Sequence, residues 1–233
     1  METRDLSMHS VYRAGRGVEE VARDLGLDPD ELIKLSSNEN SLGPSPKAVE
    51  AIRDVAEDVH YYPKSSHTDL IAELAEQWAV GDEQIWLANG GDGALDYLAR
   101  ALLEPGQSVL VPDPDFTYHG MSAKYHHGTV ETFELSEADG FHQSPERVLD
   151  AYDGHRIVYL TSPHNPTGSE VTIDEVEQIA KATDEQTLVV VDEAYEPFSE
   201  RPSKIDLVRE RTDVALLRSF SKAYGLAGIR LGY

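Results

Sequence analysis

The chain has 233 residues, of which 43 are acidic and 20 are basic, so its formal net charge is −23. Nucleic acids and anionic membranes are negatively charged themselves, and this acidic balance excludes both as partners. The absence of cysteine excludes disulfides, thiolate metal sites and a cysteine nucleophile, and the absence of a membrane-length apolar run or a secretory pattern favours the cytoplasm.

The first part of the chain is rich in turn-forming residues and predicts short helices. Gly26 is a typical helix end, and the prolines at 44 and 46 prevent a helix from starting before about residue 47. The helices expected from the apolar periodicity cover residues 18–25, 47–58 and 69–80.

From residue 84 onward, β-branched runs alternate with amphipathic stretches. The expected strands cover residues 84–88, 108–111, 129–133, 156–161, 187–192 and 214–217. The expected helices cover residues 92–103, 144–151, 172–182 and 204–211. Such an alternation predicts an α/β fold with a mostly parallel sheet sandwiched by helices.

Several of the expected strands end in unusual polar or aromatic residues. Asn89-Gly-Gly-Asp-Gly93 follows the first strand and opens a helix, where backbone N–H groups can approach an anion. Phe116 lies in a proline-rich loop, and Asn165 lies in Ser162-Pro-His-Asn-Pro-Thr-Gly168. Asp192 ends the most hydrophobic strand, where a buried carboxylate needs a cationic partner such as a pyridinium nitrogen. Taken singly, these features are also typical of tight turns and packing anchors.

Lys222 comes soon after the expected strand that ends at Leu217. Ligands of open α/β sheets bind at the carboxyl ends of strands, which places this lysine for chemistry. Ser219, Ser221 and Arg230 supply hydroxyl and guanidinium donors of the kind that bind phosphate. A lysine beside a phosphate site suggests pyridoxal phosphate, whose aldehyde forms a Schiff base with an amine. Alone, this lysine would be interpreted as a surface charge.

Together these motifs resemble the fold-type I pyridoxal-phosphate-dependent aminotransferases, and over nearly the whole chain the branch of histidinol-phosphate aminotransferases. The segments that carry the resemblance are Leu35-Ser-Ser-Asn-Glu-Asn40, Gly43-Pro-Ser-Pro46, Tyr62-Pro63, Ser162-Pro-His-Asn-Pro-Thr-Gly168, Asp192-Glu-Ala-Tyr195 and Ser219-Phe-Ser-Lys-Ala-Tyr-Gly-Leu-Ala-Gly-Ile-Arg230. The resemblance implies an N-terminal arm that is part of a small domain over 1–35 and a pyridoxal-phosphate-binding large domain over 36–233. We expect the large domain to be incomplete at its C-terminal end and the small domain to be largely missing.

The resemblance also implies roles for individual residues. Lys222 would carry the cofactor and move protons, and Asp192 would pair with the pyridine nitrogen. Asn165 and Tyr195 would bind the phenolic oxygen of the ring, while Phe116 would stack on its face. Asp192 and Tyr195 would thus act with Lys222 as catalytic residues. The implied phosphate-binding set is Gly91, Asp92, Ser219, Ser221 and Arg230.

Three further residues are implied with less direct roles. Tyr62 would reach the cofactor phosphate of the partner subunit in a homodimer, and Tyr12 and Asn38 would line the substrate pocket. The chain departs from the family pattern at Ser41, Asp115 and Gly93, where proline, threonine and glutamate are usual.

The implied reaction is transamination, most simply of histidinol phosphate and 2-oxoglutarate to imidazole acetol phosphate and glutamate in histidine biosynthesis. Three alternatives remain: the enzyme could be a threonine-phosphate decarboxylase, it could be a different fold-type I aminotransferase, or the chain could be an inactive fragment that only binds cofactor. An acyl-enzyme built on Ser219-x-x-Lys222 is a weaker one, because the sequence lacks the companion motifs Ser-Asp-Asn and Lys-Thr-Gly. The histidines lack metal-ligand spacing, so no metal site is expected. The acidic composition suits a protein adapted to molar salt, where screening weakens self-repulsion.

Overall fold

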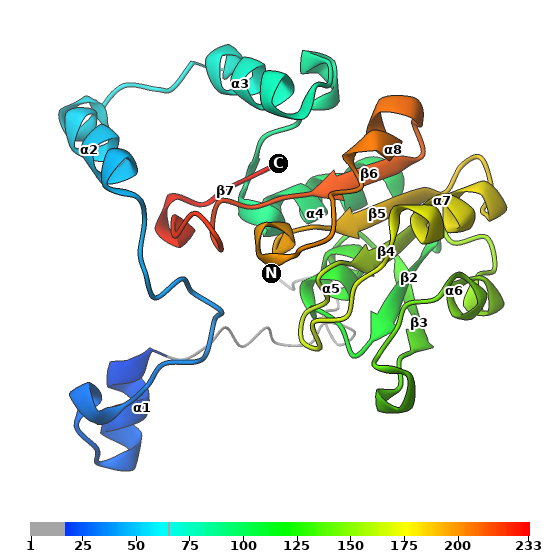
Figure 1. The fold of residues 1–233 in the computed structure, drawn as a ribbon, viewed down its shortest axis with the longest axis horizontal. Helices are drawn as coiled ribbons and strands as arrows, with labels where there is room; N and C mark the ends of the chain where they lie inside the picture. Colours follow the sequence, from blue (N-terminus) through cyan, green and yellow to red (C-terminus); the bar gives the residue numbers. More distant parts are fainter. Residues whose placement is uncertain (1–16, 65) are drawn as a thin grey trace, which may run out of the picture.

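The computed structural model describes residues 17–64 and 66–233. Its centre is a five-stranded, fully parallel sheet in the order β3-β2-β4-β5-β6 (Figure 1). The strands are β2 (Ser108–Asp113), β3 (Thr129–Glu134), β4 (Ile157–Thr161), β5 (Leu188–Asp192) and β6 (Val214–Leu217). This sheet confirms the α/β architecture predicted from the alternation of strands and helices.

The core of the sheet is formed by its most hydrophobic strands. Every residue of β4 is buried, and β4 and β5 pair in register from Ile157 with Leu188 to Thr161 with Asp192. Strands covered on both faces need apolar side chains on both, which is why these runs read as continuously hydrophobic. Because Thr161 and Asp192 lie side by side, the loops that follow them also begin side by side.

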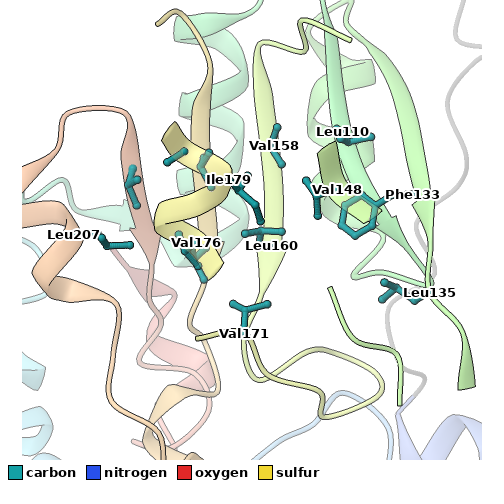
Figure 2. Close-up of a cluster of buried hydrophobic side chains, with 14 residues drawn as sticks. Leu110, Phe133, Leu135, Val148, Val158, Leu160, Val171, Val176, Ile179 and Leu207 are labelled. Carbon is teal, nitrogen blue, oxygen red and sulfur yellow. The ribbon is translucent and has the colours of Figure 1, made fainter. Parts of the chain in front are cut away.

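Alternate side chains of the strands face two helical layers. Val158 and Leu160 pack with Val176 and Ile179 of α7 (Ile173–Ala182) on one face, as Figure 2 shows. Ile157 and Tyr159 belong to a second buried cluster on the other face, which includes residues of α4 (Gly90–Leu102) and α5 (Tyr118–Tyr125). The remaining helices beside the sheet are α6 (Pro145–Ala151) and α8 (Ile205–Glu210). The two layers follow from the period of two along a strand.

Local sequence signals account for several helix boundaries, and one helix was not predicted. The hydroxyl of Ser144 caps α6, and Thr172 and Glu175 form a capping box at the start of α7. The sequence did not predict α5, because its residues show no apolar stripe and its buried positions include His119 and Ser122. Tertiary contacts, rather than periodicity, therefore fix this helix.

The N-terminal part of the described chain lies beside the sheet rather than on it. Figure 1 shows α1 (Val18–Leu25) and α2 (Pro46–Asp54) set apart and joined by extended segments, followed by α3 (Thr68–Trp78). Gly26 ends α1 in a left-handed conformation, as predicted. The helix α2 ends at Asp54, before the predicted end at 58. Large apolar side chains are exposed along this part, at Ile33, Leu35, Leu42, Val59 and Tyr62.

The prediction of a strand over 84–88 was wrong for all of these residues except Ala88. A 3-10 turn (Asp82–Gln84) comes first, and only β1 (Ala88–Asn89) is extended and paired, antiparallel to β7 (Leu231–Gly232). The apolar residues between them have no ladder partner, and Trp86 is largely exposed. Without a neighbouring strand to pair with, the strand propensity of these residues was not enough to form a strand. Among the described helices, none combines the length and hydropathy that a membrane crossing requires.

Candidate active site

A cleft of about 570 Å³ lies where the loops after β2, β4, β5 and β6 meet the start of α4. The carboxyl ends of parallel strands share one edge of a sheet, so residues far apart in sequence meet there. Most of the predicted site residues line this cleft, namely Asn38, Gly91, Asp92, Phe116, Asn165, Asp192, Tyr195, Ser219, Ser221, Lys222 and Arg230.

Two predicted residues are not among them. The side chain of Tyr62 is fully exposed and does not line the cleft. Tyr12 falls outside the described residues. Its implied role near the substrate stays a prediction, as does the implied contact of Tyr62 with a partner subunit.

One end of the cleft gathers donors suited to an anion. Helix α4 begins at Gly90, whose φ of +74° is one that residues with a side chain rarely adopt, and a Cβ there would lie 2.4 Å from Nη2 of Arg230, so the guanidinium would have to move. The same guanidinium lies 3.4 Å from the Ser221 hydroxyl and 3.3 Å from the Asp92 carboxylate. Backbone N–H groups at a helix start, a hydroxyl and a guanidinium together form a phosphate cradle.

Lys222 extends its amine into the same cleft. Its Nζ donates to the carbonyl oxygen of Ser37 at 3.0 Å and lies 5.7 Å from the centre of the Tyr195 ring. Burial lowers the pKa of the Lys222 amine, although the nearby carboxylates of Asp192 and Asp92 oppose that shift. A lysine amine with a lowered pKa is neutral more often and is therefore a better nucleophile and base.

A hydrogen bond from the N-terminal segment helps to orient Tyr195. The side-chain amide of Asn38 donates to the Tyr195 hydroxyl at 2.9 Å. Ser37 and Asn38 both have positive φ values, of 71° and 49°, which few residues other than glycine adopt. The segment that lies over Lys222 is thus held in an unusual conformation by its contacts with the cleft.

A buried group of three residues, the Asp192 cluster, consists of Asp115, His119 and Asp192. Nε2 of His119 lies 3.2 Å from Oδ2 of Asp192, and Nδ1 lies 2.8 Å from Oδ2 of Asp115. Oδ1 of Asp192 accepts a hydrogen bond from the Ala194 backbone N–H at 2.8 Å. Burial alone lowers the pKa of His119, but Asp115 and Asp192 raise it to about 10. Burial raises the pKa of Asp115, and the imidazole opposes that rise.

His119 was not predicted from the sequence. The only local signal was the spacing of Asp115 and His119, which are four residues apart, as are residues that pair on one face of a helix. Because α5 itself was not predicted, that spacing carried no weight. The contact with Asp192 joins residues 73 positions apart and depends on the fold.

A second buried group, the Glu193 cluster, consists of Glu193, Lys204 and Arg218. Nη2 of Arg218 donates to Oε2 of Glu193 at 2.5 Å, and its guanidinium lies 3.7 Å from the ring centre of Trp78. Oε1 of Glu193 accepts the backbone N–H of Lys204 at 2.8 Å. Nζ of Lys204 donates to the Ser162 hydroxyl at 2.9 Å, and burial lowers the pKa of this amine. The cluster therefore connects three of the loops that line the cleft.

A larger cavity of about 840 Å³ lies along the free edge of β6. Its walls are mostly apolar and include Trp78, Trp86 and Tyr97. Among the described residues, those that line it include no carboxylate, lysine or histidine. Acid–base and nucleophilic chemistry therefore belongs to the smaller cleft, despite the difference in volume. No cluster of potential metal ligands is present in residues 17–64 and 66–233.

Comparison with known proteins gives consistent findings. Residues 30–233 match the family model described as aminotransferase class I and II. Over 233 residues the chain is 69% identical to a histidinol-phosphate aminotransferase of Haloarcula marismortui and 64% identical to one of Natronomonas pharaonis. All of this chain is covered in each case, but it spans only 65% and 66% of the length of those relatives.

The structure is similar to a solved one. The crystal structure of histidinol-phosphate aminotransferase from Sinorhizobium meliloti in complex with pyridoxal-5'-phosphate superposes with a TM-score of 0.85 at 30% sequence identity. The match covers all of this chain and 62% of that one. The fold is therefore that of a family with solved members.

Proposed function

Because the chain belongs to the class I and II aminotransferase family, we propose that its cleft binds pyridoxal phosphate and that the whole protein transfers amino groups. The observation that carries this proposal is the convergence of Lys222, Asp192 and the Gly90–Arg230 cradle on one cleft. We propose histidinol phosphate and 2-oxoglutarate as the substrates, converted to imidazole acetol phosphate and glutamate in histidine biosynthesis. The names of the relatives support this choice.

The residues of the cleft fit this cofactor. The cradle formed by Gly90 and Arg230 suits the phosphate, since the lack of a side chain at Gly90 leaves the guanidinium in its present position. Asp192 is a buried carboxylate that lines the cleft, and a carboxylate in this position suits a protonated ring nitrogen. Asn165 and Tyr195 line the same cleft and carry donor groups that suit the phenolic oxygen.

When bound, pyridoxal phosphate supplies an aldehyde that condenses with primary amines and a protonated ring that withdraws electrons from the neighbouring carbon. Lys222 provides the amine that holds the cofactor, and its lowered pKa favours the neutral form that reacts. When not bound to the cofactor, Nζ of Lys222 would act as the base that accepts a proton from the substrate carbon and as the acid that donates it again. Phe116 would hold the ring plane by packing, and Asp192 would keep the proton on the ring nitrogen.

We also propose a homodimer with shared active sites. The exposed apolar side chains along the N-terminal part, such as Ile33 and Leu42, form surface that a second copy could cover. In that arrangement Tyr62, which is fully exposed here, would reach the partner's phosphate site. Light scattering on the chain tests the dimer, and a monomer at all concentrations would contradict it. The cytoplasmic location and the division into 1–35 and 36–233 stay predictions.

The decisive experiment on the proposed function compares Lys222→Ala with Lys181→Ala after cofactor titration. Lys181 is exposed, and the described residues give it one ion pair, with Glu177 of its own helix. We expect the unmodified chain and Lys181→Ala to show visible absorbance from bound cofactor and to fix it covalently on borohydride reduction. Lys222→Ala should do neither, and covalent fixation in this variant would overturn the proposal.

Two further measurements separate the alternatives. Product analysis with phosphorylated amino-acid substrates distinguishes transamination from decarboxylation. A chain that binds cofactor but turns over no substrate would correspond to the fragment alternative.

A further inference from the structure

His119 lies between two carboxylates and touches each with a different ring nitrogen. Nδ1 faces Asp115 at 2.8 Å, and Nε2 faces Asp192 at 3.2 Å. An imidazole nitrogen without a proton presents a lone pair, which repels a carboxylate oxygen. Both contacts are favourable together when both nitrogens carry protons, so the two contacts favour an imidazolium.

The surroundings of His119 keep water away from this arrangement. The side chain is fully buried, and its ring stacks on Tyr159 at 4.8 Å with an angle of 10° between the planes. Phe116 meets the ring edge-on at 5.5 Å. In such an enclosure the charge on one member depends strongly on the others, because solvent cannot screen it.

The charges that face His119 leave the cluster negative. Asp115 reaches it from the loop before α5 and Asp192 from the end of β5, while Tyr159 of β4 contributes only a neutral ring face. His164, from the loop after β4, also faces these carboxylates, and burial lowers its pKa so that it adds no charge at neutral pH. Two carboxylates and one imidazolium therefore sum to a single negative charge at the wall of the cleft.

We propose that Asp115 is a positioning residue for the cofactor site: it holds His119 as an imidazolium whose Nε2 proton fixes the Asp192 carboxylate in place. The inference rests on the proposed function, because Asp192 is there the partner of the ring nitrogen. With Asp115 present, the cluster keeps a net charge of −1, and Asp192 keeps one orientation toward the ring nitrogen over a wide pH range. Without Asp115, His119 faces one carboxylate only, and burial favours its neutral form. The hydrogen bond from His119 to Asp192, and with it the orientation of Asp192, then changes with pH.

The first test needs no cofactor. The chain is labelled with ¹⁵N-histidine, and the ring signals of His119, identified by their loss in His119→Gln, are followed against pH. We expect His119 to stay doubly protonated where an ordinary imidazole, with a pKa of about 6.5, has lost its proton. In Asp115→Asn, an isosteric change, the midpoint should fall by roughly two pH units or more. Titration of His119 near the ordinary value in the unmodified chain would overturn the proposal, even if the variant failed to fold.

The second test reads the consequence at the cofactor. Visible absorbance of the pyridoxal-phosphate-loaded chain is recorded against pH for the unmodified chain, Asp115→Asn, Asp115→Glu and Glu131→Gln. Glu131 is the matched control, since it approaches a different buried histidine, His155, at 3.3 Å and does not line the cleft. We expect a new spectral transition only in Asp115→Asn, with the midpoint found for His119 by NMR, and its removal in Asp115→Glu.

The outcomes of the two tests distinguish a failure of the positioning role of Asp115 from a failure of the proposed function. An unchanged spectrum in Asp115→Asn, despite a shifted His119, would overturn the positioning role. Failure of the unmodified chain to bind pyridoxal phosphate would overturn the proposed function instead, and the NMR titration would still decide whether Asp115 holds the charge on His119.

Discussion

The end of β5 separates two buried charge clusters that differ in balance. Asp192 takes part in the cluster at the cleft, and the next residue, Glu193, takes part in the cluster that also contains Lys204 and Arg218. Asp192 and Glu193 are only 5% and 1% exposed. The Asp192 cluster has two carboxylates for one imidazolium, whereas in the Glu193 cluster Arg218 pairs with Glu193 and also, at 3.2 Å, with Glu196.

This difference indicates separate purposes. A buried charge without a partner is costly, so the surplus negative charge of the Asp192 cluster suits the cationic ring nitrogen of the proposed cofactor. In the Glu193 cluster the carboxylate is paired with Arg218, and the contacts connect the loops that begin at Ser162, Glu193 and Arg218. We therefore propose a binding role for the first cluster and a role in holding the loops for the second.

The largest expected effect comes from breaking the Glu193 cluster. Arg218→Met leaves Glu193 buried without its guanidinium, which should lower the free energy of unfolding by about 3–5 kcal/mol. Urea denaturation measures this loss. The matched control is Arg201→Met: the Arg201 side chain is 53% exposed, and its ion pair with Glu170 should contribute less than about 1 kcal/mol. Equal losses in the two variants would contradict the contrast between the clusters.

A smaller effect, of a different kind, is expected from the Asp192 cluster. Asp192→Asn keeps the shape of the side chain but removes the charge proposed to meet the ring nitrogen, a charge-assisted contact of about 1.5–3 kcal/mol. Cofactor affinity should therefore fall by roughly 10- to 150-fold, with a smaller loss of stability than in Arg218→Met. Spectroscopic titration of cofactor measures the affinity, with the exposed Asp150→Asn as the control. Unchanged affinity in Asp192→Asn would indicate that this carboxylate does not serve the cofactor.

The same contrast explains how far the sequence could predict the site. Strand ends at Asp192 and Leu217 follow from hydrophobic runs, and parallel strands necessarily bring the loops after them together. The partners of these loops could not be predicted, because His119, Lys204 and Ser162 reach their contacts across 73, 11 and 42 positions of sequence. The short strand at Ala88 depends likewise on pairing with Gly232. Periodicity predicts elements, whereas buried polar contacts depend on how the elements pack.

The pH dependence of stability tests the charge held on His119. Its pKa of about 10 lies above the ordinary 6.5, so between these values the folded chain keeps a proton that the unfolded chain has released. This contribution to the free energy of unfolding is complete below pH 6.5 and is lost as the pH rises towards 10. The slope is at most about 1.4 kcal/mol per pH unit. Asp115→Asn should show a flatter slope in urea denaturation than the unmodified chain, and equal slopes would contradict the assignment.

Salt should stabilise the acidic surface and leave the buried clusters almost unchanged. Of the expected effects, its effect on the stability difference between the unmodified chain and Arg218→Met is the smallest. The net charge of −23 predicts that molar salt raises the stability of the whole chain, because it screens repulsion between exposed carboxylates. Halophilic relatives support this expectation. Salt screens buried pairs far less, so the stability difference between the unmodified chain and Arg218→Met should change by less than about 1 kcal/mol between low and molar salt. Denaturation of both at the two salt concentrations measures it. If the difference disappeared at molar salt, the Glu193 cluster would behave as a surface ion pair, and its role in holding the loops of the cleft would be lost.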